Sequence, residues 1–267
     1  MNKMLRVAVG GWCDVSTASY DSVSFSVAGQ NSTPKGLTFK PDGTKMYMVG
    51  RIGNSAYQYS LSTAWDLDTA AYDSVNVSVP NSPTSVVFKP DGTKMYVSSS
   101  SSDSVYQYSL STAWDLDTAA YDSVSFDAGS EEVLVSAVVF KQDGTKMYIM
   151  GYASDSVHQY SLSTAWDLDT AAYDSVSFDV SEQDGGPRGL TFKPDGTKMY
   201  MVGTQNDSVY QYSLSTAWDL DTAAYDSVSF DVSEQDASPY GIAFKNNGRK
   251  MYIMGENNNT LYQYSLC

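Results

Sequence analysis

The sequence has little histidine and cysteine and no long apolar segment. Its 267 residues include one histidine and two cysteines, so neither a Cys/His pair nor a Ser/His/Asp triad is predicted. No glycine-rich phosphate loop precedes a helix. Because no run of about 18 apolar residues occurs, no transmembrane helix is predicted. The N-terminal apolar run is too short for a secretory signal.

Basic residues are also scarce. The chain has 16 lysines and arginines against 31 aspartates and glutamates, which gives a formal net charge of −15. Such a charge repels phosphate backbones and anionic lipid, so nucleic acid is not an expected partner. In contrast, 42% of the residues are hydrophobic and 13% are aromatic. This composition predicts a packed core.

The most prominent feature is an internal repeat. The motif "FKPDGTKMY", with small changes in two copies, recurs at spacings of 49 and 52 residues. The copies begin at Phe39, Phe88, Phe140, Phe192 and Phe244. A fixed period of this length predicts a repeat architecture.

Each repeat contains four predicted strands, shown here by the fourth repeat. Residues 189–193 and 198–203 flank "PDGT", a sequence typical of a tight turn. Residues 207–214 and 225–232 alternate apolar and polar side chains, the pattern of a strand with one buried face. Four-stranded units of 40–50 residues are typical of β-propeller blades.

The motif "SPxGxxFKPDGTKMYMVG…DSVYQYSLST" resembles the YVTN/NHL and TolB-like propellers. The connector "LSTAWDLDTA" is similar to those of repeat propellers encoded by phages and marine bacteria. The resemblance implies an all-β fold, and the five repeats predict a five-bladed propeller with four antiparallel strands per blade. It implies no particular activity, because one fold carries many functions.

The repeat is split at the chain ends. The outer strand occurs first at residues 20–27, before any inner strand, and the last repeat stops after its third strand. The fifth blade is therefore expected to take its outer strand from the N-terminus. Residues 1–19 form a lead-in and seam, and residues 20–267 form one propeller domain.

Two cysteines flank this split. Cys13 and Cys267 stand at positions where no other repeat has cysteine. Ring closure should bring them within reach of a disulfide, although a reducing cytosol would keep them as free thiols.

The loops on one rim differ between repeats, whereas those on the other rim are nearly constant. Immediately before the inner strands, five equivalent positions are predicted to bind a ligand: Lys35, Thr84, Ser136, Arg188 and Tyr240. A mixed set of cationic, hydroxyl and aromatic groups suits an asymmetric polar ligand. Unrestrained drift of exposed loops after duplication would also produce this variation.

The constant connector offers a second set of groups. Asp66, Asp68 and Asp73 would be the ligands if the chain bound Ca²⁺, but turn capping explains them better, since the N-terminal copy has Ser16 in place of Asp68, so no metal or cofactor is expected. The repeated tryptophans, Trp65, Trp114, Trp166 and Trp218, could bind sugars in a tachylectin-like arrangement or could pack between blades.

The sequence favours a non-enzymatic module that binds a glycan or protein receptor through the variable rim. Its alternatives are a structural ring in a virion or surface assembly and a multivalent lectin. No channel-mouth position carries a carboxylate, and the adjacent Glu131 and Glu132 do not alone form an active site. His158 replaces a tyrosine of the other repeats and is interpreted as a tolerated substitution. A monomeric ring in an extracellular or virion-associated setting is expected.

Overall fold

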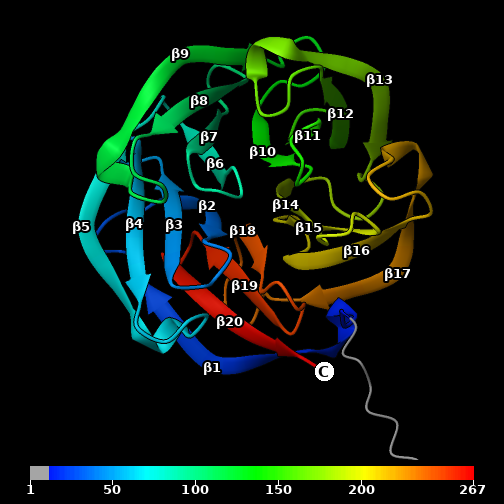
Figure 1. Ribbon diagram of the computed structural model, residues 1–267. Coiled ribbons are helices and arrows are strands. Elements are labelled where there is room, and N and C mark those ends of the chain that lie inside the picture. Colours follow the sequence, from blue (N-terminus) through cyan, green and yellow to red (C-terminus); the bar gives the residue numbers. More distant parts are fainter. Residues whose placement is uncertain (1–11) are drawn as a thin grey trace, which may run out of the picture.

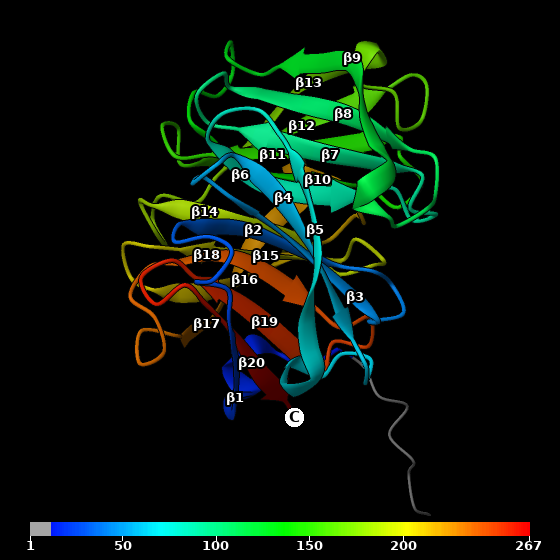
Figure 2. The ribbon, with the colours of Figure 1, turned by 90° about the vertical axis from the view of Figure 1, so that its left-hand side faces the viewer.

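The chain forms a ring of five four-stranded antiparallel sheets around a central channel (Figure 1). The structure, a computed structural model, describes residues 12–267. The five-bladed propeller predicted from the repeats is therefore confirmed. In the side view, loops extend from two opposite faces of the ring (Figure 2).

Four blades are each built from consecutive strands, the innermost strand first. Their bounds are β2 (Pro34–Phe39), β3 (Lys45–Gly50), β4 (Ser55–Leu61) and β5 (Ala70–Ser78); β6 (Pro83–Phe88), β7 (Lys94–Ser99), β8 (Ser104–Leu110) and β9 (Ala119–Asp127); β10 (Val135–Phe140), β11 (Lys146–Gly151), β12 (Ser156–Leu162) and β13 (Ala171–Asp179); and β14 (Pro187–Phe192), β15 (Lys198–Gly203), β16 (Ser208–Leu214) and β17 (Ala223–Asp231).

The fifth blade joins the two ends of the chain, with the strand order β1-β20-β19-β18. Its strands are β1 (Ala18–Ser26), β18 (Pro239–Phe244), β19 (Lys250–Gly255) and β20 (Thr260–Leu266). A short 3₁₀ helix precedes the outer strand of each blade: η1 (Val15–Thr17), η2 (Leu67–Thr69), η3 (Leu116–Thr118), η4 (Leu168–Thr170) and η5 (Leu220–Thr222). None of the helices in residues 12–267 has the length and apolar character needed to cross a membrane.

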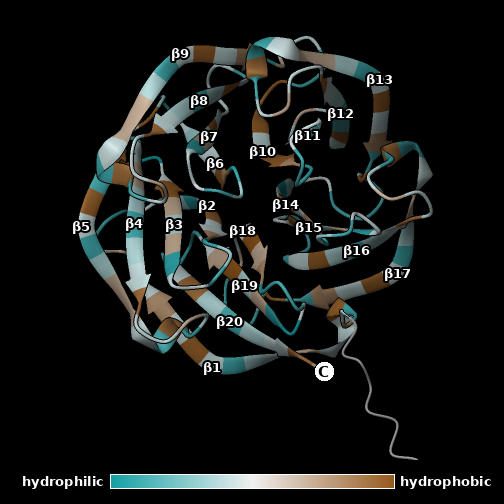
Figure 3. Cartoon of the chain, in the orientation of Figure 1, coloured by the Kyte–Doolittle hydropathy of each residue, from teal (hydrophilic) through white to brown (hydrophobic). Residues whose placement is uncertain are grey.

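Burial follows the sequence pattern. Strand β15 is almost wholly buried, whereas the outer strand β17 alternates between more and less exposed residues. The outer strands accordingly show alternating hydrophilic and hydrophobic bands (Figure 3). The second strand of a blade lies between neighbouring blades, whereas the outer strand has one face in water. The two burial patterns therefore differ.

The turn between β2 and β3 shows why "PDGT" is repeated. The Asp42 carboxylate accepts a hydrogen bond from the Thr44 amide at 2.9 Å, and Gly43 has φ +75°. The Trp65 indole lies where a side chain on residue 43 would project, so glycine is needed both for the turn and for this contact.

Aromatic side chains join neighbouring blades. Trp65 and Phe39 of the first blade pack against Tyr252 of the fifth, and the Tyr252 hydroxyl donates to the Trp65 carbonyl at 2.6 Å. Equivalent Tyr–Trp contacts occur at the next three interfaces. Only 7% of Trp65 is exposed, so this side chain is committed to blade packing.

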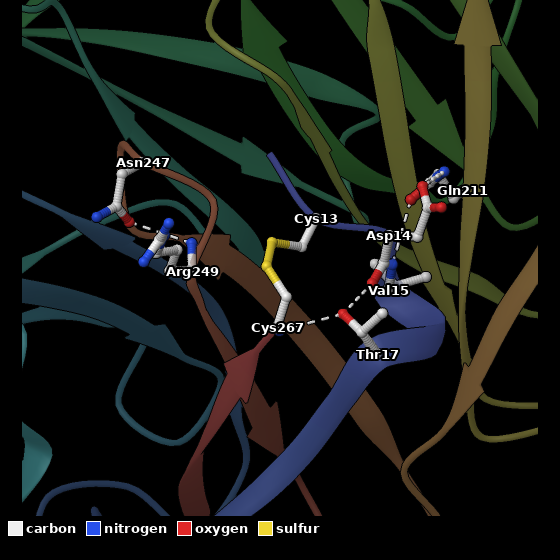
Figure 4. Close-up of a disulfide and its surroundings, with 8 residues drawn as sticks. All are labelled: Cys13, Asp14, Val15, Thr17, Gln211, Asn247, Arg249 and Cys267. Atoms are coloured by element: carbon white, nitrogen blue, oxygen red, sulfur yellow. Dashed lines mark hydrogen bonds between the residues drawn. A yellow bond between two sulfur atoms is a disulfide. The ribbon is translucent and has the colours of Figure 1, made fainter. Parts of the chain in front are cut away.

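The seam of the ring is closed as the split repeat predicts. Strand β1 pairs with β20 from Ala18 opposite Leu266 to Ser26 opposite Thr260. The Cys13 and Cys267 Cα atoms are 6.1 Å apart and the residues form a disulfide (Figure 4). Beside it, the Cys267 amide donates to the Thr17 hydroxyl at 3.3 Å. The predicted disulfide is thus confirmed, and β1 begins two residues earlier than expected.

Candidate functional site

The channel contains a cavity of about 240 Å³ that reaches both faces of the ring. On the variable rim it is lined by Thr84, Ser136, Arg188 and Tyr240, and on the constant rim by side chains of the β-turns, such as Pro41 and Gln142. We define the start ring as the second position of each inner strand, which comprises Lys35, Thr84, Ser136, Arg188 and Tyr240.

Three members of the start ring lie together. The Lys35 ammonium is 3.4 Å from the centroid of the Tyr240 ring, and the Arg188 guanidinium carbon is 5.0 Å from that centroid. Lys35 is 1% exposed, whereas Arg188 and Tyr240 are half-buried. The phenol ring thus lies close to two cations and contributes cation–π attraction to both.

The other two members of the start ring make hydrogen bonds within and between blades. The Thr84 hydroxyl contacts the Ser98 hydroxyl at 2.9 Å and donates to the Val135 carbonyl at 3.0 Å. The Ser136 hydroxyl donates to the Met150 carbonyl at 3.1 Å. Both side chains are buried and contribute more to the channel wall than to a reactive cluster.

A second ring of variable residues contacts the first and was not recognised in the sequence. We define the end ring as the residue that follows the second strand of each blade: Arg51, Ser100, Tyr152, Thr204 and Glu256. These positions differ in every repeat, as the start ring does. That difference is the signal that could have identified them.

The two rings contact each other, in two cases across a blade boundary. The Lys35 ammonium of the first blade forms a 2.5 Å ion pair with the Glu256 carboxylate of the fifth. Arg188 donates from Nε to the Thr204 hydroxyl at 3.3 Å, and its guanidinium carbon lies 4.0 Å from the centroid of the Tyr152 ring.

The surroundings of Lys35 change its acidity. Burial lowers the pKa of the Lys35 ammonium to about 8, because a charge in a dry site is disfavoured. Glu256 opposes this shift, and the positive charges of Arg51 and Arg188 reinforce it. Burial also raises the pKa of the Tyr240 phenol, which therefore remains protonated. Lys35 can thus exchange a proton near neutral pH.

The opposite mouth of the channel is chemically different. A cavity of about 480 Å³ is lined there by Pro41, Pro90, Trp114, Gln142 and Asn246, among other residues. None of its lining side chains titrates near neutral pH. The cavity at the constant rim is therefore the larger one, but only the variable rim has side chains that can exchange protons.

The connector aspartates have local structural contacts. The Asp66 carboxylate accepts from the Asp68 amide at 3.2 Å and caps η2. The Asp73 carboxylate pairs with Lys45 at 3.0 Å and accepts hydrogen bonds from Gln58 and Ser60. Within residues 12–267, no group of three histidine, cysteine, aspartate or glutamate side chains is arranged to hold a metal ion.

The lone histidine belongs to a local pair. His158 Nε2 is 3.6 Å from the Glu132 carboxylate, and the Ser154 hydroxyl contacts both. This group anchors the loops of the third blade, and Glu132 is 1% exposed. Glu131 and Glu132 therefore do not form a paired carboxylate site.

Comparison with known proteins gives a functional direction. Residues 137–266, slightly under half of the chain, match the family model "Lactonase, 7-bladed beta-propeller". The chain itself closes five blades. A comparison with curated protein sequences finds no match.

Solved structures with the same fold include enzymes. A candidate 6-phosphogluconolactonase from Bacteroides uniformis is 15% identical with a TM-score of 0.53, over 82% of this chain and 63% of that one. One from Bacteroides fragilis is 15% identical with a TM-score of 0.51, over 86% and 70%. A luciferin-regenerating enzyme is 11% identical with a TM-score of 0.52, over 91% and 94%. The chain thus spans less than two thirds of the Bacteroides uniformis protein, and the likeness shows the fold.

These findings correct the functional prediction from the sequence. The expectation of a non-enzymatic glycan or protein receptor module, with a structural ring or lectin as alternatives, is contradicted by the match to a lactonase family. No comparison supports the lectin-like or phage-like assignments. Glu256, which belongs to the end ring and pairs with Lys35, was also missed, because carboxylates were sought in the start ring alone.

Proposed function

We propose that the chain is an enzyme that hydrolyses a lactone, a cyclic ester, at the variable mouth of the channel. The observation that carries the proposal is the ion pair of Lys35 and Glu256 beside Tyr240 and Arg188. The lactonase family match supports the reaction class. The repeat's resemblance to YVTN/NHL and TolB-like propellers adds support for the fold alone.

The cluster contains the groups that ester hydrolysis requires. Glu256 retains 24% of its side-chain exposure, so water can reach the carboxylate. Glu256 acts as general base and takes a proton from a water molecule whose oxygen bonds to the lactone carbonyl carbon. The Arg188 guanidinium stabilises the oxyanion that forms on the carbonyl oxygen.

Glu256 also completes the reaction. As the ester C–O bond breaks, the proton that Glu256 took from water passes to the departing ring oxygen, which becomes a hydroxyl. Lys35 is 1% exposed and acts through Glu256, because its ammonium holds the carboxylate by a 2.5 Å hydrogen bond. One water is consumed, one hydroxy acid is formed, and Glu256 recovers its initial charge.

The local charge also suits the product. Lys35, Arg51 and Arg188 bring three cations close to Tyr240 and Glu256, in a chain whose net charge is −15. The hydroxy acid formed by ring opening is an anion at neutral pH. The sugar lactone 6-phosphogluconolactone is the first substrate to test, since similar structures bear the corresponding enzyme name.

The protein should accelerate ring opening of such lactones, and its rate should decline as pH rises through about 8. The decline follows from the lowered pKa of Lys35, because the ammonium that holds the Glu256 carboxylate loses its proton in this range. Acid release in a pH-stat, corrected for spontaneous hydrolysis at each pH, measures both quantities.

The control is heat-denatured protein at the same concentration, which should match the spontaneous rate. Failure of the native protein to accelerate any lactone would overturn the proposed reaction. A rate that continued to rise above pH 8, after correction, would exclude a role for the Lys35 ammonium in the reaction.

A further inference from the structure

We propose that the substrate carries an apolar chain, and that this chain lies on an apolar lip beside the reacting groups. We define the lip as Val133, Leu134 and Tyr152, which belong to loops of the third blade on the variable rim. The inference rests on the proposed lactone hydrolysis and specifies which lactones the site prefers.

The lip is an unusual concentration of exposed apolar surface. Val133 is 47% exposed, Leu134 45% and Tyr152 40%. Only five large hydrophobic side chains are exposed in residues 12–267, and three of them form the lip. Gathered exposed apolar residues mark a binding surface more often than scattered ones do.

Leu134 is held in an unfavourable backbone conformation. Its φ is +62°, a value that leucine rarely adopts. The Leu134 amide donates to the Asp103 carboxylate at 2.7 Å, and its carbonyl accepts from the Tyr152 amide at 3.2 Å. The corresponding positions of the other repeats carry threonine, serine, glycine and serine. A leucine fixed toward solvent at this position thus costs stability, which is typical of a functional residue.

The lip is continuous with the proposed active site. The Tyr152 ring lies 4.0 Å from the Arg188 guanidinium carbon, and Arg188 lines the channel cavity. A lactone whose carbonyl oxygen faces Arg188 would therefore direct a substituent across Tyr152 towards Leu134. Three side chains are too few for a stable protein interface, which buries about 800 Å² per partner. We therefore assign the lip to a single aliphatic chain of the substrate.

The test compares lactones that differ only in chain length. The probes are γ-butyrolactones with butanoyl, hexanoyl or octanoyl groups on an α-amino nitrogen, used below their micelle concentrations. KM should fall about tenfold from butanoyl to octanoyl, because each added methylene leaves water on the lip. The value of kcat should stay nearly constant, since the chain binds equally in the ground and transition states.

Substitutions test whether the dependence of KM on chain length arises at the lip. Leu134→Ser should abolish most of the dependence of KM on chain length, and serine suits the backbone because Ser82 has φ +52° at the equivalent position. Val133→Ser is a second variant that leaves this backbone position unchanged. Ile52→Ser is the matched control, because Ile52 is 56% exposed on the same rim but belongs to the first blade. It should retain the full dependence.

The outcomes separate this inference from the proposed function. If the protein hydrolyses the lactones with a KM independent of chain length, the lip is not a substrate site. An unchanged chain-length dependence in both lip variants would likewise exclude the lip as the place where the chain binds. If neither these probes nor unsubstituted lactones are hydrolysed, the proposed function itself fails, and the inference fails with it.

Discussion

Replacing Glu256 with glutamine should lower kcat for lactone hydrolysis by about 100-fold or more, the usual contribution of a general base. Glutamine preserves the size of the side chain but cannot accept a proton from water at neutral pH. It also removes the negative partner of the Lys35 ammonium, 2.5 Å away. Initial rates at several lactone concentrations would give kcat and KM separately, and thermal unfolding would verify the fold.

Glu234→Gln provides the matched control. Glu234 is an exposed carboxylate in the loop that leads into the same blade, so its replacement changes the net charge equally. It should leave kcat within about twofold of the unaltered protein, because the side chain is solvated and a surface substitution of this kind has little effect. Equal losses in the two variants would indicate a general charge effect and would exclude Glu256 as the base.

Reduction of the Cys13–Cys267 disulfide should destabilise the protein by up to about 5 kcal/mol. The bond joins residues separated by 254 positions, so it restricts the unfolded chain across nearly its whole length. For a domain of this size, such a loss corresponds to a fall in Tm on the order of 10 °C. Differential scanning calorimetry with and without a thiol reductant measures it.

The double variant Cys13→Ser, Cys267→Ser separates the bond from side effects of the reductant. It should unfold at the Tm of the reduced native protein and should not respond to reductant. The β1–β20 pairing remains in this variant, so the ring should still form. If oxidised and reduced native protein have the same Tm, then strand pairing alone holds the seam.

The fold could be predicted because the same information occurs five times. Apolar alternation, the "PDGT" turn and the split motif all predict the same blades and the same closure. Even the disulfide followed from this topology, since Cys13 and Cys267 are the residues on either side of the seam. Such agreement between local and global signals is what allows a sequence to predict a fold.

The site could be predicted only in part. The start ring was found because its members occupy one position of the repeat, and three of them do gather at the mouth. The partnership of Lys35 with Glu256 was missed because the two residues are 221 positions apart and meet only when the fifth blade closes against the first. The loop after β19 shows no regular pattern from which the direction of the Glu256 side chain could be inferred.

The apolar lip illustrates the same difficulty. Val133 and Leu134 resemble ordinary core residues in the sequence, and nothing there indicates that both are exposed to water. Their exposure results from the loop that holds Leu134 at φ +62° between Asp103 and Tyr152. A backbone conformation imposed by tertiary contacts cannot be deduced from composition or periodicity.

The most direct test of the active-site assignment is a crystal structure of the Glu256→Gln variant with a lactone that the unaltered protein hydrolyses. The intact lactone should lie at the variable mouth, with its carbonyl oxygen within hydrogen-bond distance of Arg188 and its ring oxygen facing the side chain of residue 256. A lactone bound instead at the opposite mouth, against Pro90 and Trp114 in the larger cavity, would contradict the assignment.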